Sequence, residues 1–362
     1  MQSERQRLCD ARNRDKDGGA TWRANAGHTK QKPQEGETYM VHGVINVRKE
    51  KGMTSFGVVS RMRRIFNQKK IGHTGTLDPE VEGVLVICMG KATKLVDDMS
   101  RGTKTYRCTM LLGRVTDTQD LTGTTLRECE VTADEEEVRR ALLAFSGKQM
   151  QTPPMYSAVK VNGRKLVDLA RRGIEVERKA REVEFSGIGI EEIALPRVTF
   201  HVTCSHGAYI RTLCHDVGEA LGCGACMASL VRTRVEEFRL EDAHTLAELE
   251  AMKKEEDERN PEKMYSFVIP IDHFYRTYPA CVVKEAAARL ALNGVRLDSD
   301  EIMNREEVAD TGIRVEGELC GGGEIKEQSS LRLYTADASF IGIFLKRGGK
   351  YIMQKHFYVG AI

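Results

Sequence analysis

The sequence lacks long apolar runs and has almost no net charge. None of its 362 residues lies in a run of about 18 uncharged apolar residues, so no membrane-spanning helix is predicted. Residues 1–38 also lack the apolar core of a secretory signal. Lys and Arg total 55 and Asp and Glu total 53, which gives a net charge of +2. Binding of nucleic acid would therefore depend on local clusters of positive charge.

Ten cysteines are present, but they form no paired framework of the kind found in small secreted proteins. We expect free, mostly buried thiols in a reduced cytoplasmic enzyme. Cys223 and Cys226 have the spacing of redox and zinc sites, yet no second pair lies at a suitable distance. A glycine-rich nucleotide loop of the GxxxxGK[ST] type is also missing. The sequence therefore predicts no metal ion and two free thiols at this pair.

Residues 1–39 lack the apolar side chains that a folded segment needs. Leu8 and Trp22 are the main apolar residues of this stretch, and its acids nearly balance its bases. Such a segment cannot bury enough surface to offset the entropy lost on ordering. We predict a disordered N-terminal extension, with Met40 as an alternative start of the chain. A functional basic arm is the less favoured interpretation.

From residue 40 onward, apolar periodicity indicates buried strands and amphipathic helices. Thr54 or Ser55 is suited to cap a helix that runs to about Lys70. The faces of this helix outside the apolar stripe are basic, and no acid occurs between residues 54 and 70. The expected strands are 43–47, 84–89, 105–112, 183–193 and 197–205, and the other expected helices are 133–145 and 209–221.

The C-terminal part has a different pattern. Residues 244–264 are rich in Glu and Lys, which indicates a helix followed by a connector. We predict a catalytic domain over residues 40–268 and a small β-rich module over residues 269–362. The elements expected in that module are a helix at 284–292, an Asn293-Gly294 turn, and strands at 331–335, 340–345 and 350–358.

One segment has a pattern suited to chemistry, namely His73-Thr74-Gly75-Thr76-Leu77-Asp78-Pro79. Its glycine and proline impose a tight loop between the basic helix and a buried strand. Asp78 is the lone carboxylate of this loop, and loops on a rigid scaffold often carry catalytic groups. A carboxylate in such a place can also simply cap a turn. On local sequence alone, this second interpretation is favoured.

The same segment, extended back to Gly72, resembles the catalytic motif of the TruB family of pseudouridine synthases. Further blocks match that family in order over about residues 40–362, and an ordered set is far more specific than one motif. These blocks are Gly43 to Val47 with Lys51 to Ser55, Lys104 to Arg107, Pro153 to Gly163, Gly207 to Leu213, and Leu230 to Thr233. The resemblance implies an α/β (α+β) catalytic domain with a mixed, largely antiparallel sheet and a cleft across its middle.

The chain departs from the common family pattern in two places. Arg48-Lys49-Glu50 stands where many members have Asp-Lys-Pro. Glu80-Val81-Glu82 follows the motif where a more apolar segment is common. Neither departure touches Asp78. Both affect only the expected RNA contacts near this loop.

The resemblance implies that uridine 55 in the T loop of tRNA is converted to pseudouridine. The N-glycosidic bond is broken, the uracil turns, and it is rejoined to the sugar through carbon. No cofactor is needed, because the base is both leaving group and nucleophile. The reaction needs a nucleophilic carboxylate, a group that holds the ring and a group that moves a proton from carbon. Asp78 is the implied nucleophile, and it attacks either the sugar or the base.

Four more residues gain roles from the resemblance. Arg211 is implied beside Asp78, where a permanent charge with forked donors suits a desolvated carboxylate. Tyr106 is implied to stack on the uracil and to remove the proton. Tyr209 is implied to bond to the catalytic groups, and Leu230 to form an apolar wall. Without the family match, Tyr106 and Leu230 would be assigned to the core.

RNA binding is expected to rely on phosphate contacts and loop shape. The target base must leave its stack, and the resemblance implies that His73 stabilises the flipped arrangement. Two basic runs flank the motif and are expected to supply cations, although most charged runs are only solvated surface. The residues concerned are Arg64, Lys69 and Lys70 in the first run and Lys160, Arg164, Lys165, Arg171 and Arg172 in the second.

The C-terminal module resembles the PUA-like domain of many family members, which implies contact with the tRNA acceptor region. The expected partner is the T-arm stem-loop of tRNA, with a monomeric chain, no membrane and no obligatory protein partner. Two alternatives stay open: a guide-RNA-dependent enzyme of the related box H/ACA type, and a non-catalytic protein that binds or folds tRNA. The long segment 120–200 favours the stand-alone bacterial type.

Overall fold

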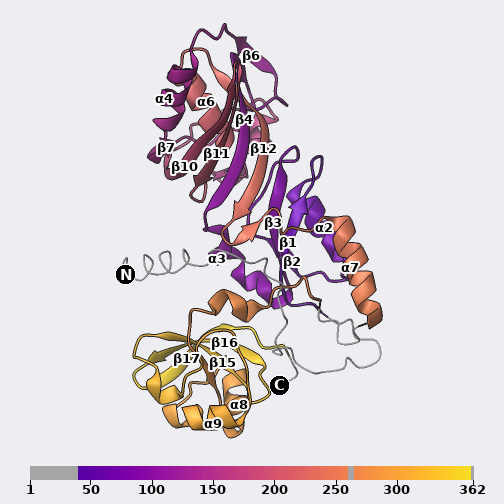
Figure 1. The fold of residues 1–362 in the computed structure, drawn as a ribbon, viewed down its shortest axis with the longest axis vertical. Helices are drawn as coiled ribbons and strands as arrows, with labels where there is room; N and C mark the ends of the chain where they lie inside the picture. Colours follow the sequence, from indigo (N-terminus) through magenta and orange to yellow (C-terminus); the bar gives the residue numbers. More distant parts are fainter. Residues whose placement is uncertain (1–39, 260–264, 360–362) are drawn as a thin grey trace. The chain divides into compact units, whose positions relative to one another are not determined.

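The computed structural model describes residues 40–259 and 265–359, so the expectation for residues 1–39 lies outside the described residues. Two compact units are present, which Figure 1 shows in ribbon form. The first contains the described residues up to Tyr275 and those from Lys355 onward, and the second contains Arg276–Gln354. No helix in the described ranges is both long and apolar enough to cross a lipid bilayer.

A nine-stranded sheet forms the centre of the first unit (Figure 1). Its strands are β1 (Gly43–Lys49), β2 (Ile71–His73), β3 (Glu82–Met89), β4 (Lys104–Leu112), β7 (Gly147–Gln151), β10 (Arg181–Ala194), β11 (Arg197–Cys204), β12 (Ala225–Val235) and β13 (Phe238–Arg239). The main path runs β1-β3-β12-β4-β11-β10-β7, with β2 beside β3 and β13 beside β12. The β3–β12 pair is parallel, and the other described pairs are antiparallel. The predicted mixed, largely antiparallel sheet is therefore confirmed.

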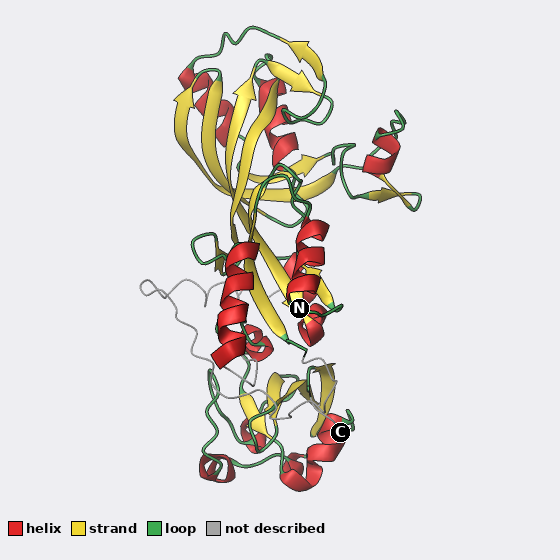
Figure 2. Cartoon of the chain, turned by 90° about the vertical axis from the view of Figure 1, so that its right-hand side faces the viewer, coloured by secondary structure: helices red, strands yellow, loops and turns green. Residues whose placement is uncertain are grey.

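Two helices cover the β1–β3 end of this sheet. They are α2 (Ser55–Ile65) and α7 (Leu246–Arg259), the pair of long helices near the middle of Figure 2. Met62 of α2 and Leu249 of α7 are fully buried against Val47 and Leu85 of the sheet. Burial of such side chains contributes about 1.5–3 kcal/mol each. This core fixes the start of α2, which lies next to the loop that carries Asp78.

Two other helices cover the part of the sheet formed by β4, β10, β11 and β12. These are α4 (Glu135–Leu143) and α6 (Ile210–Ala220), which Figure 1 shows beside those strands. Val138 of α4 and Leu213 of α6 pack into one core with Met110 and Phe200. Asp134 caps α4 by accepting a hydrogen bond from the Glu137 amide at 2.8 Å. The packing of α6 is what brings its first turn to the sheet centre.

The basic helix is shorter than the sequence predicted, because α2 ends at Ile65 rather than near Lys70. Asn67 adopts a left-handed conformation with φ of 47°, which an α-helix cannot continue through. The buried Gln68 side chain then accepts a hydrogen bond from the Val41 amide and donates one to its carbonyl. Lys69 and Lys70 therefore lie in a connection to β2 and not on the helix.

Short elements connect the main ones. Two small hairpins stand apart from the nine-stranded sheet, one formed by β5 and β6 and one by β8 and β9. The bounds of these elements are η2 (Gly90–Leu95), α3 (Val96–Ser100), β5 (Arg114–Thr116), β6 (Thr125–Glu128), β8 (Lys160–Val161), β9 (Arg164–Lys165), α5 (Leu166–Ala170) and η3 (Ile271–Tyr275).

The second unit is built on a four-stranded sheet of order β14-β15-β16-β17. Its core contains Leu331, Leu333, Ile341 and Phe344, all of which are fully buried. The β-rich character predicted for the C-terminal part is therefore confirmed. The elements are β14 (Ala280–Val282), α8 (Glu285–Leu292), η4 (Ser299–Glu301), α9 (Arg305–Asp310), η5 (Gly322–Glu324), β15 (Ser330–Tyr334), β16 (Phe340–Arg347) and β17 (Lys350–His356).

Candidate active site

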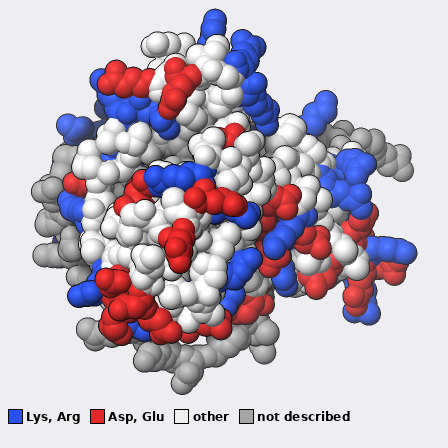
Figure 3. All heavy atoms as spheres, turned by 90° about the horizontal axis from the view of Figure 1, so that it is seen from above, with Lys and Arg blue, Asp and Glu red and all other residues white. Residues whose placement is uncertain are grey.

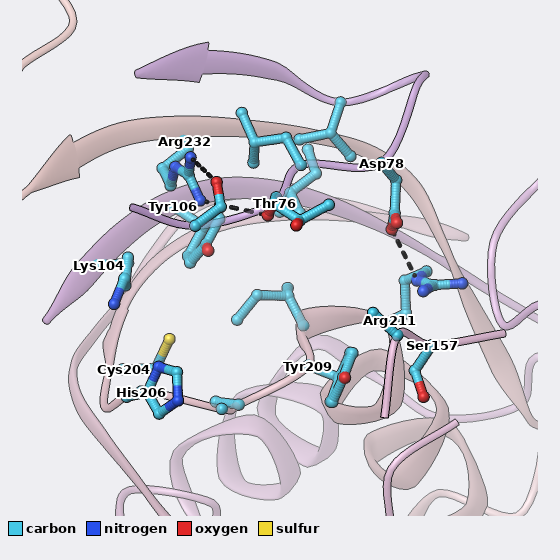
Figure 4. A pocket seen from close by; sticks show the side chains of 18 of the residues that line it. Thr76, Asp78, Lys104, Tyr106, Ser157, Cys204, His206, Tyr209, Arg211 and Arg232 are labelled. Atoms are coloured by element: carbon cyan, nitrogen blue, oxygen red, sulfur yellow. Dashed lines mark hydrogen bonds and ion pairs between the residues drawn. The ribbon is translucent and has the colours of Figure 1, made fainter. Parts of the chain in front are cut away.

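A pocket of about 270 Å³ opens beside the central strands β4 and β12 (Figure 4). Its walls come from segments far apart in the sequence. Asp78 comes from the loop before β3, Tyr106 from β4, Arg211 from α6, and Leu230 from β12. The pocket is thus formed by the sheet together with the packing of α6, and not by a single segment of the chain.

The loop that carries Asp78 is tied to the start of α2. The buried Ser55 hydroxyl accepts a hydrogen bond from the Leu77 amide at 2.8 Å and donates one to the Leu77 carbonyl at 3.1 Å. Thr54 caps the same helix by accepting a hydrogen bond from the Gly57 amide. The amide and the carbonyl of Leu77, the residue before Asp78, are therefore both fixed by hydrogen bonds.

Lys49 holds the loop on the other side of Asp78. This lysine is fully buried at the end of β1. Its ammonium donates to the carbonyls of Pro79 at 3.0 Å and Val81 at 2.6 Å. Burial lowers the pKa of Lys49 to about 8, and the nearby carboxylates of Asp78 and Glu80 oppose this shift. The loop is thus fixed from two sides, which limits how far Asp78 can move.

Arg211 forms the ion pair that the sequence predicted beside Asp78. Its Nε lies 3.2 Å from Oδ2 of Asp78, and Figure 4 shows the two side chains pointing toward one another. The arginine side chain is 7% exposed and the aspartate side chain is 45% exposed. The cation is therefore buried, and the carboxylate that it holds is open to the pocket. The remaining guanidinium nitrogens donate to the carbonyls of Thr118 at 2.9 Å and Tyr156 at 2.8 Å.

A second carboxylate, which the sequence interpretation missed, also lies against Arg211. Oδ2 of Asp120 is 3.5 Å from Nη1 of Arg211. The other oxygen of Asp120 accepts hydrogen bonds from the Thr118 hydroxyl, the Thr122 amide and the Thr122 hydroxyl. Hydroxyls two residues before and two residues after an aspartate are the signal that could have indicated a self-bonded turn at this position.

Tyr106 and Leu230 lie on the same side of the sheet. In the β4–β12 register, Arg232 is opposite Tyr106 and Leu230 is opposite Cys108. Side chains directly opposite one another in an antiparallel pair point to one face, so Tyr106, Leu230 and Arg232 all face the pocket. Burial raises the pKa of Tyr106, and the Arg232 guanidinium acts in the opposite direction.

The end of the pocket away from Asp78 is rich in positive charge. Arg232 is 2% exposed and donates to the carbonyls of Val84 at 2.7 Å and Gly75 at 3.1 Å. Lys104 is also buried, and its ammonium donates to the carbonyls of Ser100 and Gly102. Burial, together with the charge on Arg232, lowers the pKa of Lys104 to about 8, and Cys204 and Glu236 oppose this shift.

Tyr209 lies at the start of α6, where it is the N-cap residue and lines the pocket. Its amide donates to Oε1 of Gln151, and Nε2 of Gln151 donates to its carbonyl. The ring of Tyr209 lies under the Arg181 guanidinium, with 5.3 Å between that group and the ring centroid. This positions the ring at the edge of the pocket near Arg211 (Figure 4).

Several residues predicted for substrate binding do not line the pocket. His73 ends β2 next to the lining residue Thr74. Burial lowers the pKa of His73, and Arg232 lowers it further. The basic residues lie on the surface outside the pocket: Arg64 on α2, Lys69 and Lys70 before β2, and Lys160 on β8. The pocket thus brings together Asp78, Tyr106, Tyr209, Arg211 and Leu230.

No group of three or more His, Cys, Asp or Glu residues suited to hold a metal ion occurs in the described ranges. Cys223 and Cys226 are buried, and both thiols are free. Burial raises the pKa of Cys226 to about 11, which keeps this thiol protonated at neutral pH.

Comparisons with protein families agree with this geometry. The model for the "TruB family pseudouridylate synthase (N terminal domain)" matches residues 63–210, and that for the "tRNA pseudouridylate synthase B C-terminal domain" matches residues 211–275. Two curated relatives carry the name tRNA pseudouridine synthase B. The protein of Alkaliphilus oremlandii is 42% identical over 81% of this chain and 96% of its own length. The Clostridium acetobutylicum protein is 38% identical over 83% of this chain and 94% of its own length.

Solved structures with a similar fold include chains of two complexes that contain Cbf5 and Nop10. A chain in the crystal structure of a Cbf5-Nop10-Gar1 complex aligns with a TM-score of 0.59 and 26% identity, over 87% of this chain and 84% of that one. A chain in the archaeal box H/ACA sRNP Nop10-Cbf5 complex aligns with a TM-score of 0.57 and 26% identity, over 88% and 86% of the two chains.

Proposed function

Because the chain belongs to the TruB family of pseudouridine synthases, we propose that it isomerises uridine 55 to pseudouridine in the T loop of tRNA. The observation that carries this proposal is the Asp78–Arg211 ion pair, which opens onto a pocket lined by Tyr106 and Leu230. The pairing gives a carboxylate beside a base-sized cavity.

The reaction begins when the target uridine leaves its stack and enters the pocket. Flipping a base out of RNA costs a few kcal/mol, so the protein must offer compensating contacts. Tyr106 offers an aromatic face, Leu230 an apolar wall, and Tyr209 a second ring at the edge. His73 lies outside the lining, at the end of β2, and its proposed role is to contact the RNA around the vacated position.

Asp78 is the nucleophile. If it attacks the sugar, the electron pair of the N-glycosidic bond moves to the ring. If it attacks the base, the electrons of the ring double bond move to a ring carbonyl oxygen. In both routes negative charge passes from the carboxylate to the uracil. Arg211 positions Asp78 through its Nε and remains charged throughout.

After the ring has turned and its carbon has bonded to the sugar, that carbon loses its proton and the ring nitrogen released from the sugar gains one. Tyr106, which lines the pocket, accepts the carbon proton in this proposal. The product has the same atoms as the substrate, so no cofactor enters the balance. The fixed loop around Asp78 keeps the nucleophile near the sugar during the turn.

Phosphate contacts from surface cations hold the RNA. On the face shown in Figure 3, Lys and Arg side chains are interspersed with Asp and Glu, which agrees with the small net charge. The cations must therefore act from local clusters. One is the β8–β9 hairpin with Lys160, where Asn162 and Gly163 turn with positive φ of 51° and 79°. The other contains Arg64, Lys69 and Lys70.

The wider assignments follow from the same function. A catalytic domain over residues 40–268 carries the pocket, and a PUA-like module over residues 269–362 contacts the acceptor region of the tRNA. The enzyme acts in the cytoplasm as a monomer, and it needs no metal and no protein partner. Guide-RNA dependence is the second candidate, since chains of box H/ACA complexes share the fold at 26% identity. Activity on a bare T-arm stem-loop, without guide or added protein, separates the two.

Replacing Asp78 by Asn tests the assignment, because Asn keeps the shape but cannot act as the nucleophile. We expect modification of unmodified tRNA to fall by at least about a thousandfold, with RNA affinity kept within about threefold. Pseudouridine is mapped by carbodiimide primer extension, and affinity by filter binding. Glu130→Gln, which removes an exposed carboxylate outside the pocket, is the control and is expected to keep full activity. Undiminished modification by Asp78→Asn would overturn the proposal.

A further inference from the structure

Charge is distributed unevenly along the pocket. At one end Arg211 lies between two carboxylates, those of Asp78 and Asp120, so this group carries one net negative charge. At the other end are Arg232 and Lys104, and Figure 4 shows them on the opposite side of the view from Asp78 and Arg211. Among the described residues no carboxylate forms an ion pair with either of these two cations. The pocket is therefore negative at one end and positive at the other.

A buried cation without a carboxylate partner is costly in a folded protein. Arg232 is 2% exposed, and its donors reach the carbonyls of Val84, Gly75 and Thr76. Carbonyl oxygens solvate a guanidinium but do not neutralise it. The effect of this charge reaches its neighbours, because Arg232 lowers the pKa of Lys104 and of His73. Glu236, which does not line the pocket, partly opposes this effect at Lys104. No carboxylate of the pocket lining compensates the positive charge at this end.

The proposed reaction supplies the missing negative charge. Whichever atom Asp78 attacks, an electron pair moves from the carboxylate to the uracil ring. The ring lies between the two ends of the pocket, beside Tyr106, and Arg232 is directly opposite Tyr106 in the β4–β12 register. An oriented charge in a site with little water stabilises such a transferred charge far better than water does.

We propose that Arg232, together with Lys104, forms a positive wall of the base pocket that stabilises the negative charge passed from Asp78 to the uracil ring. This inference rests on the proposed function. The stabilisation by Arg232 grows as the reaction proceeds. Its guanidinium attracts the neutral uridine only weakly, but it attracts the anionic ring with a full charge. Its contribution therefore belongs to kcat rather than to binding.

The same charge acts on Tyr106, which must lose its proton before it can accept one from carbon. Three side chains act on this phenol: Arg232 from β12, Cys204 from β11, and Asp78 from the loop before β3. Burial and Asp78 hold the proton on Tyr106, and Arg232 favours its release. Cys204 is a neutral thiol, because burial raises its pKa to about 12. Arg232 is thus the group that favours the basic form of Tyr106.

Three variants test the proposal: Arg232→Met, Arg232→Lys and the control Arg234→Met. Arg234 lies on the same strand but is exposed and does not line the pocket. The readout is the steady-state rate of tritium release from carbon 5 of uridine in a T-arm stem-loop, measured against substrate concentration and against pH. For Arg232→Met we expect kcat to fall about a hundredfold or more with KM within about threefold, and Arg232→Lys to be intermediate. Arg234→Met should behave as the wild type.

The pH profile separates an electrostatic role from a merely structural one. Removal of Arg232 raises the pKa of Tyr106, so the ascending limb of the rate should move to higher pH. 3-Fluorotyrosine at position 106, followed by fluorine NMR, should titrate at least about one pH unit higher in Arg232→Met. If Arg232→Met does not fold, the same two measurements on Arg232→Lys decide, with a smaller shift in the same direction expected.

Two results would overturn the proposal. One is a pH–rate profile and a fluorine titration that are both unchanged in Arg232→Met. The other is an effect of Arg232→Met on KM alone. If the wild-type protein releases no tritium from the stem-loop, the proposed function fails and this inference fails with it. If the wild type is active and the Arg232 variants match it, only this inference fails.

Discussion

Arg211 is shared between two carboxylates, and this sharing controls how strongly it holds the nucleophile. Nε faces Asp78 at 3.2 Å and Nη1 faces Asp120 at 3.5 Å. Asp120 is itself fixed by three hydrogen bonds to one of its oxygens. The turn therefore sets the position of the arginine, which in turn sets the position of Asp78. Asp120 is a positioning residue in this chain of contacts.

Asp120→Asn should weaken both stability and catalysis. The amide nitrogen would face Nη1 of Arg211, which leaves two donors opposed at a buried position. We expect the free energy of unfolding to fall by about 3 kcal/mol, and kcat to fall about tenfold or more with KM little changed. Urea titration and steady-state assays of tritium release measure the two effects. Asp117→Asn, in the same turn but exposed, is the control, and equal losses in both variants would contradict the argument.

The sequence predicts the residues of the motif better than the residues that support them. Asp78, Tyr106 and Arg211 come together in one pocket, as their family blocks imply. Arg232 stands in one of those blocks, yet its position follows from the register of β4 against β12, which local sequence does not specify. Asp120 belongs to no block. Its importance depends on a contact with Arg211, which is distant in sequence.

At the scale of elements, the catalytic loop depends on a helix that begins 22 residues earlier, since Ser55 bonds to both polar backbone atoms of Leu77. The sequence predicts a helix start at Thr54 or Ser55 from its capping pattern. Thr54 takes the capping role, and this leaves the Ser55 hydroxyl for the loop. The sequence could not predict which of these two hydroxyls caps the helix and which binds the loop, because that depends on what packs against the helix start.

Ser55→Ala should loosen the loop while leaving α2 intact. The Leu77 amide and carbonyl would lose their partners at a buried site, and an unsatisfied buried group costs about 1–3 kcal/mol. We expect a loss of unfolding free energy in that range and a several-fold fall in kcat, because Asp78 is held less firmly. Thermal denaturation and tritium release from the stem-loop measure these changes. Ser60→Ala on the same helix is the matched control, and a Ser55→Ala enzyme with wild-type kcat would contradict the proposed role.

At the scale of the whole molecule, each unit has its own hydrophobic core. Among the described residues, the two apolar clusters of the first unit contain no residue of Arg276–Gln354, and the cluster of the second contains none outside that range. Composition and apolar pattern could predict a β-rich C-terminal module. They could not give the division at Tyr275 and Arg276 or the inclusion of Lys355–Val359 in the first unit, which depend on tertiary contacts.

Leu333→Ala should separate the roles of the two units. Leu333 is fully buried in the core of the second unit, and such a truncation costs about 2–5 kcal/mol. The described apolar clusters beside the pocket contain no residue of that unit, so activity on a T-arm stem-loop should stay within about twofold of the wild type. Activity on full-length tRNA should fall further through KM, because the proposed contact with the acceptor region would be lost. Leu290→Ala makes the same chemical change at an exposed position of the same unit and should leave both activities unchanged. Equal KM values for Leu333→Ala and the wild type on full-length tRNA, with the second unit shown to be unfolded by calorimetry, would contradict the acceptor contact.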